Sequence, residues 1–210
     1  MVLGLDTCLN ACGAAVIDGE RVLAAASEPM ARGHQERLAT LVQEVMAAAG
    51  LRFADLDRIA VTLGPGSFTG LRVGLAFAKG LAAALDRPLA GVGVLEALAA
   101  GAPQGLTLAV LDARRDQVYF QPFRDGAPLA GPESLALDVA LARAAALAAG
   151  APTTLVGSGA ALIAGAVPGA RLVPAEGADP VRVARLAAGR PPAAAAPLYL
   201  RAPDARLPAA

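Results

Sequence analysis

Histidine and cysteine are both scarce in this sequence of 210 residues, which contains one histidine, His34, and two cysteines, Cys8 and Cys12. A catalytic dyad or a metal centre built on two histidines is therefore excluded, and the sequence has no Cys/His cluster of the kind that binds zinc. A bridge between two cysteines so close in sequence would do little for a fold of this size. We therefore expect buried, reduced thiols in a cytoplasmic protein, and neither a metal nor a cofactor.

An excess of charge of either sign is lacking as well, since 18 basic residues balance 18 acidic ones. The chain therefore has no net basic field to draw nucleic acid through its phosphates, although this balance does not argue against a local basic patch. The composition, 56% hydrophobic and 17% charged, excludes a disordered chain. Asp6 interrupts the apolar start, so we expect no signal peptide. Glycines and prolines divide the long uncharged stretch 144–170, so we expect no membrane span there.

Apolar runs and turn residues predict an α/β protein of two lobes. In the first half we expect strands at residues 2–5, 14–17, 21–26, 59–63 and 89–92, and helices at 34–49, 70–85 and 95–100. In the second half we expect strands at 106–111, 118–123, 154–156 and 171–173, and helices at 134–149 and from Asp179-Pro180 onward. The Gly101–Gly105 segment marks the boundary, so the predicted lobes are 1–102 and 103–210. The packing of about the last 15 residues is left open.

A glycine-rich loop, Gly64–Gly70, lies between a predicted strand and a predicted helix. Such a loop can bind an anion through free backbone N–H groups and the helix dipole. Its glycine spacing, however, matches neither the P-loop nor the dinucleotide fingerprint. Two interpretations stay open: a structural turn, or a weak nucleotide or phosphate contact formed by Asp6, Thr7, Gly66 and Ser67.

The predicted helix after this loop is apolar on all sides, with Arg72 and Lys79 as its only charged residues. A helix of this kind needs cover on every side, which either the rest of the monomer or a partner chain can supply. Small residues recur at four-residue steps, at Gly70, Gly74, Ala78 and Ala82. A ridge of small residues permits close helix contact, so we expect this ridge to pack against a partner.

The segment Gly64–Gly74, followed by Ala78–Leu81, resembles the signature of the TsaB (YeaZ) family. Shorter pieces agree with this family in order and spacing, and the resemblance covers nearly the whole chain. These pieces are Leu5-Asp6-Thr7, Gly33–Leu38, Leu95–Ala99, Leu111–Arg114, Val118-Tyr119 and Pro197–Arg201.

The resemblance implies a two-lobed fold of the actin/Hsp70/sugar-kinase (ASKHA) type, each lobe a mixed β-sheet with helices. It also implies support of threonylcarbamoyl transfer to the adenosine next to the anticodon of tRNA. In that system TsaB is the non-catalytic relative of TsaD, which binds metal through an H-x-x-x-H motif. Here His34 is followed four residues later by Leu38, so this chain is not expected to be the enzyme.

The implied partners are a TsaD-like catalytic subunit, a TsaE-like ATPase and, when the chain is alone, a second copy of itself; direct contact with tRNA is left open. The resemblance places the pairing surface on two helices, at His34, Glu36, Arg37, Leu38, Leu41, Val42, Val45, Leu71, Arg72, Gly74, Leu75, Ala78, Lys79 and Ala82. Two other hypotheses remain. One is a stand-alone phosphotransferase or ATPase of the same fold. The other is a peptidase, for which His34 would be the lone histidine base.

Overall fold

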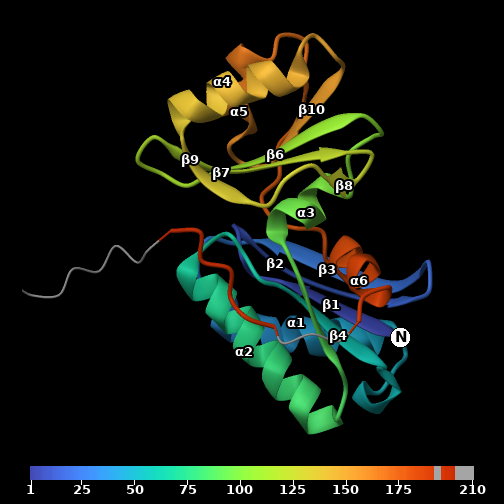
Figure 1. The fold of residues 1–210 in the computed structure, drawn as a ribbon. Coiled ribbons are helices and arrows are strands. Elements are labelled where there is room, and N and C mark those ends of the chain that lie inside the picture. The colour runs from blue at the N-terminus through green and yellow to red at the C-terminus, as the bar shows by residue number, and fades with distance from the viewer. Residues whose placement is uncertain (192–194, 202–210) are drawn as a thin grey trace, which may run out of the picture.

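The computed structural model describes residues 1–191 and 195–201. Figure 1 shows two lobes, one above the other, each built on a β-sheet with helices packed against it. The chain completes the sheet of the first lobe, crosses through the short helix α3 (Val94–Ala99) and builds the second lobe. It then returns to the first lobe through helix α6 (Pro180–Ala188), as Figure 1 shows.

The first lobe contains a five-stranded mixed sheet in the order β3-β2-β1-β4-β5. The strands are β1 (Val2–Asp6), β2 (Ala11–Asp18), β3 (Arg21–Pro29), β4 (Arg58–Thr62) and β5 (Leu89–Val92). The first three strands form an antiparallel meander, while β4 and β5 are parallel to β1. All five predicted strands of this lobe are confirmed within a few residues at their ends.

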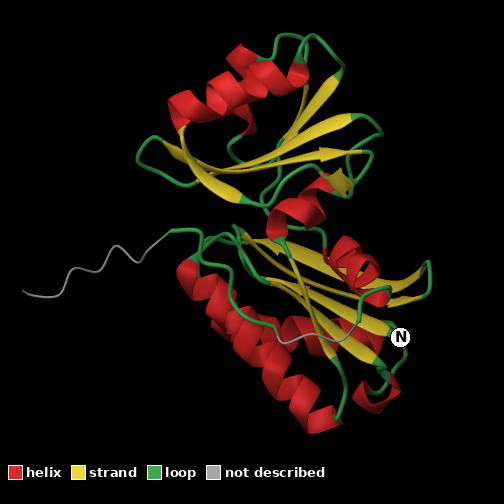
Figure 2. Ribbon diagram, viewed as in Figure 1, coloured by secondary structure: helices red, strands yellow, loops and turns green. Residues whose placement is uncertain are grey.

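Two long helices, α1 (His34–Ala48) and α2 (Phe68–Leu85), cover one face of this sheet (Figure 2). Alternate residues of a strand point to opposite faces, so Leu3 and Leu5 of β1 join the core under α1 and α2. Ala60 of β4 faces the other way and packs with α6. A 3-10 turn, Phe53–Asp55, leads from α1 into β4.

Helix α6 lies on the opposite face of the first sheet, although the predicted second lobe included it. A Cβ at Gly4 of β1 would come closer than 3.0 Å to the backbone of Pro180 and Ala184, so glycine permits this close packing. Asp179 caps the helix by accepting a hydrogen bond from the Val181 N–H at 2.9 Å, as its position before Pro180 predicts. The predicted second lobe is therefore wrong over Pro180–Ala188, because α6 packs on the first lobe.

The second lobe contains a sheet in the order β11-β10-β6-β7-β8, with β9 also paired to β7. Its strands are β6 (Leu106–Asp112), β7 (Gln117–Arg124), β8 (Ala127–Pro128), β9 (Glu133–Ala136), β10 (Thr153–Val156) and β11 (Arg171–Val173). Its helices are α4 (Leu137–Ala148) and α5 (Ala160–Ile163), and a 3-10 turn, Ala164–Ala166, follows α5. The helix predicted over 134–149 is wrong in its first turn. Pairing with β7 holds residues 134–136 in an extended conformation instead.

Candidate functional site

The turn after β1 is built around Asp6, whose carboxylate is fully buried. One of its oxygens accepts hydrogen bonds from Thr62 Oγ1 at 2.7 Å and from the Cys8 N–H at 3.1 Å. The other oxygen accepts from the Ala178 N–H at 2.8 Å. Burial raises the pKa of this carboxyl, and the three hydrogen bonds oppose that shift. Asp6 therefore ties β1 to β4 and to the segment before α6, and both its oxygens are already occupied.

The glycine-rich loop packs directly against this turn. A Cβ at Gly66 would come closer than 3.0 Å to the carbonyl oxygen of Cys8, and a Cβ at Gly70 would come equally close to that of Thr7. Thr7 is buried, and its Oγ1 donates to the Gly70 carbonyl at 2.7 Å. The loop and the turn after β1 are therefore in direct backbone contact. The predicted phosphate contact is wrong for Asp6 and Thr7, because neither side chain is accessible.

A cavity of about 320 Å³ opens between the two lobes. Gly66 and Ser67 line it from the first lobe, and Asp112, Arg114 and Ser158 line it from the second. Asp112 accepts a hydrogen bond from the Arg114 N–H at 2.7 Å, which stabilises the turn between β6 and β7. Across residues 1–191 and 195–201, His, Cys, Asp and Glu side chains form no group of three or more that could bind a metal ion.

Both cysteine thiols are free and buried. Burial raises the pKa of the Cys8 thiol, and the nearby Asp6 carboxyl raises it further. Burial likewise raises the pKa of Cys12 to about 11. A thiol with a raised pKa is a poor nucleophile at neutral pH, so neither cysteine suits covalent catalysis. The prediction of two buried, reduced thiols is confirmed.

Most of the predicted pairing residues face inward in this structure. Buried in the first lobe are Leu38, Leu41, Val42, Val45, Leu71, Gly74, Leu75, Ala78 and Ala82. The ridge of small residues lies against the lobe's own sheet, because a Cβ at Gly74 would collide with Thr7 Oγ1. These residues form the core and are not surface contacts, so the predicted pairing surface is corrected at these positions.

The outer face of α2 carries the residues that a partner could reach. Arg72 and Lys79, two of the predicted pairing residues, are exposed, and so is Glu36 at the start of α1. Between them, exposed small residues and half-buried apolar ones form a strip that the sequence reasoning missed, which we call the outer strip: Val73, Ala76, Phe77, Gly80 and Ala83. The sequence indicates this strip through Arg72 and Lys79. Residues seven apart lie on the same side of a helix, so two charged residues at this spacing mark that side as solvent-facing.

Helix α2 begins with a side-chain cap. Ser67 is the N-cap residue, and its Oγ accepts from the Gly70 N–H at 3.3 Å. The helix is also long and apolar enough that length and composition alone would allow a membrane crossing. A helix that packs on its own sheet meets the same criterion, and α2 is packed in this way.

An aromatic cluster joins the start of α2 to the C-terminal segment. Phe68 and Tyr199 stack with ring centroids 5.4 Å apart, and the Arg72 guanidinium lies 3.6 Å from the centre of the Phe68 ring. Arg72 Nε also donates to the Tyr199 hydroxyl at 3.0 Å. Two residues further on, Arg201 Nη1 donates to the Ala113 carbonyl of the second lobe at 2.9 Å. The segment 195–201 therefore contacts both lobes.

Several known proteins are similar to this chain in sequence or in fold. The family of tRNA N6-adenosine threonylcarbamoyltransferase (TsaD) matches residues 26–129. An uncharacterized Mycobacterium tuberculosis protein is 41% identical over 213 residues, which cover 98% of this chain and 93% of that protein. The Escherichia coli tRNA threonylcarbamoyladenosine biosynthesis protein TsaB is 35% identical over 127 residues, 59% of this chain and 54% of TsaB. YeaZ from Pseudomonas aeruginosa superimposes with a TM-score of 0.78 at 26% identity, over 95% of this chain and 99% of YeaZ.

The chain belongs to the TsaB (YeaZ) family. The ROK hexokinase from Thermus thermophilus shares the fold, with a TM-score of 0.51 at 17% identity over 89% of this chain and 97% of the hexokinase. This TsaB-family chain therefore has the two-lobed ASKHA-type fold that the resemblance implied, and the recognition of the family is confirmed.

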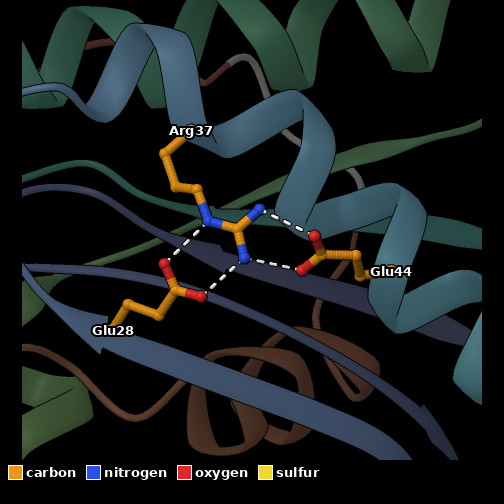
Figure 3. Close-up of polar contacts among 3 residues, drawn as sticks. All are labelled: Glu28, Arg37 and Glu44. Atoms are coloured by element: carbon orange, nitrogen blue, oxygen red, sulfur yellow. Dashed lines mark hydrogen bonds and ion pairs between the residues drawn. The ribbon is translucent and has the colours of Figure 1, made fainter.

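Arg37, another predicted pairing residue of this TsaB-family chain, is engaged inside the first lobe. Its guanidinium donates to both Glu28 oxygens on β3, at 2.7 and 2.5 Å, and to both Glu44 oxygens on α1, at 2.9 and 2.6 Å (Figure 3). Hydrogen bonds from Arg37 hold the pKa values of both glutamates below their ordinary value. The ion pairs of Arg37 with Glu28 and Glu44 connect α1 to β3, so Arg37 stabilises the fold of the monomer.

At neutral pH, above the ordinary carboxyl pKa of 4.5, we expect the Arg37→Gln variant to have a lower free energy of unfolding than the wild-type protein. We expect this difference to shrink in acid. The folded carboxylates have the lower pKa, so the ion pair stabilises at neutral pH and loses this effect as the pH falls through their folded-state pKa values. Urea unfolding at pH 7 and in acid measures the difference between the two proteins. Arg21→Gln, an exposed arginine at the start of β3, is the control. An equal loss for Arg37→Gln at both pH values would contradict the prediction.

Proposed function

We propose that this chain is the non-catalytic pairing subunit that binds a TsaD-like catalytic protein during threonylcarbamoyl transfer to tRNA. The observation that carries the proposal is the outer strip of α2, in which exposed small residues and half-buried apolar ones lie beside the exposed Arg72 and Lys79. Exposed apolar surface of this kind favours a protein partner. In this proposal the contacts come from the outer strip with Glu36, Arg72 and Lys79, in a cytoplasmic complex that a TsaE-like ATPase joins.

The described residues form no evident catalytic centre, which is in line with a non-catalytic subunit. Asp6 is fully buried, and both of its carboxylate oxygens already accept hydrogen bonds. The TsaB proteins of Escherichia coli, Haemophilus influenzae and Bacillus subtilis carry the name of the threonylcarbamoyladenosine biosynthesis system. In the absence of its partner, the same strip would pair with a second copy of the chain in a symmetric dimer.

Size-exclusion chromatography with light scattering tests the proposal on this chain alone and mixed with the TsaD-like protein of the same genome. We expect a dimer for the chain alone and a stable heteromer for the mixture, because the outer strip favours burial over contact with water. A monomer in both runs would overturn the proposal, since the strip would then need no partner.

The second candidate function is a stand-alone phosphotransferase or ATPase, which the cavity between the lobes favours. This hypothesis predicts ATP binding by the isolated chain at millimolar concentration and slow hydrolysis. Isothermal titration with ATP and Mg²⁺ distinguishes the two functions. Binding together with phosphate release by the chain alone would favour the enzyme over the pairing subunit.

A further inference from the structure

Two exposed aromatic rings gather at the start of α2. The chain has five phenylalanines and two tyrosines, all within the residues that the structure describes, and of these only Phe68 and Tyr199 are exposed. Their side chains are 43% and 44% exposed, and they stack on each other although Phe68 belongs to α2 and Tyr199 to the C-terminal segment. Aromatic side chains are enriched at the centre of protein interfaces, so this pair marks a binding surface.

Arg72 is held in place by these two rings. Its guanidinium lies 3.6 Å from the centre of the Phe68 ring, and its Nε donates to the Tyr199 hydroxyl at 3.0 Å. Within residues 1–191 and 195–201, neither Nη group of Arg72 forms a hydrogen bond or an ion pair. The guanidinium is therefore ordered in the monomer while both Nη groups are left to donate. A side chain that is already ordered loses less entropy when it binds a partner.

The cluster of Phe68, Arg72 and Tyr199 is continuous with the outer strip. Phe68, Arg72 and Ala76 follow one another at four-residue steps, so they lie along one side of α2. A partner that covers Ala76 therefore covers Arg72 as well. Burying the guanidinium without a counter-ion would be costly, so such a partner has to place an acidic group against it.

The charges on the two helices favour a protein carboxylate over an RNA phosphate. Helix α2 carries two basic residues and no acidic one, so its face complements an acidic group. The neighbouring helix α1 presents the exposed carboxylate of Glu36, and Arg37 neutralises only one of the two charges of Glu28 and Glu44. These acids would repel a polyanion such as tRNA. A protein can place one carboxylate against Arg72 and keep its other acidic groups away from α1.

We propose that Arg72 anchors the pairing surface by binding the carboxylate of an aspartate or glutamate of the TsaD-like partner, and that Phe68 and Tyr199 position its guanidinium. The inference rests on the proposed function and names the chemistry by which the partner is recognised. A carboxylate can accept two parallel hydrogen bonds from a guanidinium, a geometry that lysine does not offer. His34, another predicted pairing residue, is buried at the start of α1 and does not compete for this role.

Replacing Arg72 by lysine tests the anchor, because this change keeps the charge and removes the planar guanidinium. We expect Arg72→Lys to weaken binding of the TsaD-like protein of the same genome at least about ten-fold, as measured by isothermal titration. The matched control is Arg124→Lys, at an exposed position of β7 in the second lobe, which should bind as the wild-type protein does. Equal affinities for Arg72→Lys and Arg124→Lys would overturn the proposal.

Tyr199→Phe tests the positioning role, because it removes the hydroxyl that accepts from Arg72 and keeps the stacked ring. We expect binding to weaken by about two- to ten-fold, the usual range for one hydrogen bond. In the double variant with Arg72→Lys, the two losses should not add, because Tyr199 acts through Arg72. Additive losses would show that Tyr199 does not position Arg72.

Charge reversal tests whether the recognised group is a carboxylate. We expect Arg72→Glu to lose pairing, and we expect one lysine replacement among the surface aspartates and glutamates of the TsaD-like protein to restore it. If no such replacement restored pairing, the carboxylate would be the wrong group. Arg72→Lys that bound tRNA more weakly but paired normally would likewise overturn the proposal, in favour of a phosphate contact.

Failure of the anchor is distinguishable from failure of the proposed function. A wild-type chain that does not bind the TsaD-like protein at all would overturn both. A wild-type chain that pairs, together with an Ala76→Arg variant that does not pair and an Arg72→Lys variant that pairs normally, would leave the pairing function in place and overturn the anchor alone.

Discussion

Replacing Ala76 by arginine is expected to abolish pairing with a TsaD-like partner while the monomer stays folded. Ala76 is exposed in the middle of the outer strip, so the new side chain meets only water in the isolated chain. In a complex the same guanidinium would be buried without a counter-ion, which costs roughly 3–5 kcal/mol. That cost corresponds to a loss of affinity of at least about 100-fold. Light scattering of the mixture measures it as a return to separate species.

The matched control is Ala145→Arg, which places the same residue on an exposed position of α4 in the second lobe. It should leave pairing intact, because α4 lies away from the outer strip (Figure 1). Arginine is a good helix former, so neither variant should lose helical content. If Ala76→Arg paired as well as Ala145→Arg, the outer strip would not be the interface. Arginine at Leu75 or Ala78 would not test this point, because both side chains lie in the core and the lobe would unfold.

Alanine at Gly70 is expected to destabilise the protein by about 1–3 kcal/mol, the usual cost of forcing extra atoms into a packed region. A Cβ at this position would come closer than 3.0 Å to the carbonyl oxygen of Thr7, and backbone cannot move aside as a flexible side chain can. The contact joins the start of α2 to the turn after β1, so we also expect the Thr7 hydrogen bond to Gly70 to be disturbed.

Alanine at Gly80 of the same helix is expected to have the opposite effect on stability. A Cβ there meets nothing within 4 Å. Alanine should therefore stabilise the protein by about 0.5–1 kcal/mol, because alanine loses less backbone entropy than glycine in a helix. Urea unfolding of both variants against the wild-type protein measures the contrast. Shifts of the same sign for Gly70→Ala and Gly80→Ala would show that helix propensity alone, and not contact with Thr7, governs these positions.

Local patterns were sufficient for most of the secondary structure. The strands at 89–92 and 171–173 match residue for residue, and the helix start at Asp179-Pro180 is correct. The exception, β9, was predicted as the first turn of a helix. Its residues are held by hydrogen bonds to β7, a partner distant enough in sequence that no local pattern shows it.

The candidate site was predicted less well than the fold. Gly66 and Ser67 do line a cavity between the lobes, but Asp6 and Thr7 are buried beneath the loop. The error has a physical cause. An aspartate at the end of a strand can bind a ligand or tie two strands together, and which of these it does depends on groups such as Thr62 and Ala178 that come from elsewhere in the chain.

The sequence by itself determined the elements, the family and the apolar character of α2, because these follow from short-range periodicity and from a contiguous motif. Only the tertiary structure decided which face of α2 is buried, since Gly70 and Gly74 fit against Thr7 and turn Ala76 outward. It also decided that α6 returns to the first lobe, where Gly4 leaves room for it. Both outcomes depend on close contacts between residues far apart in the chain, and these contacts form only when the whole sheet is assembled.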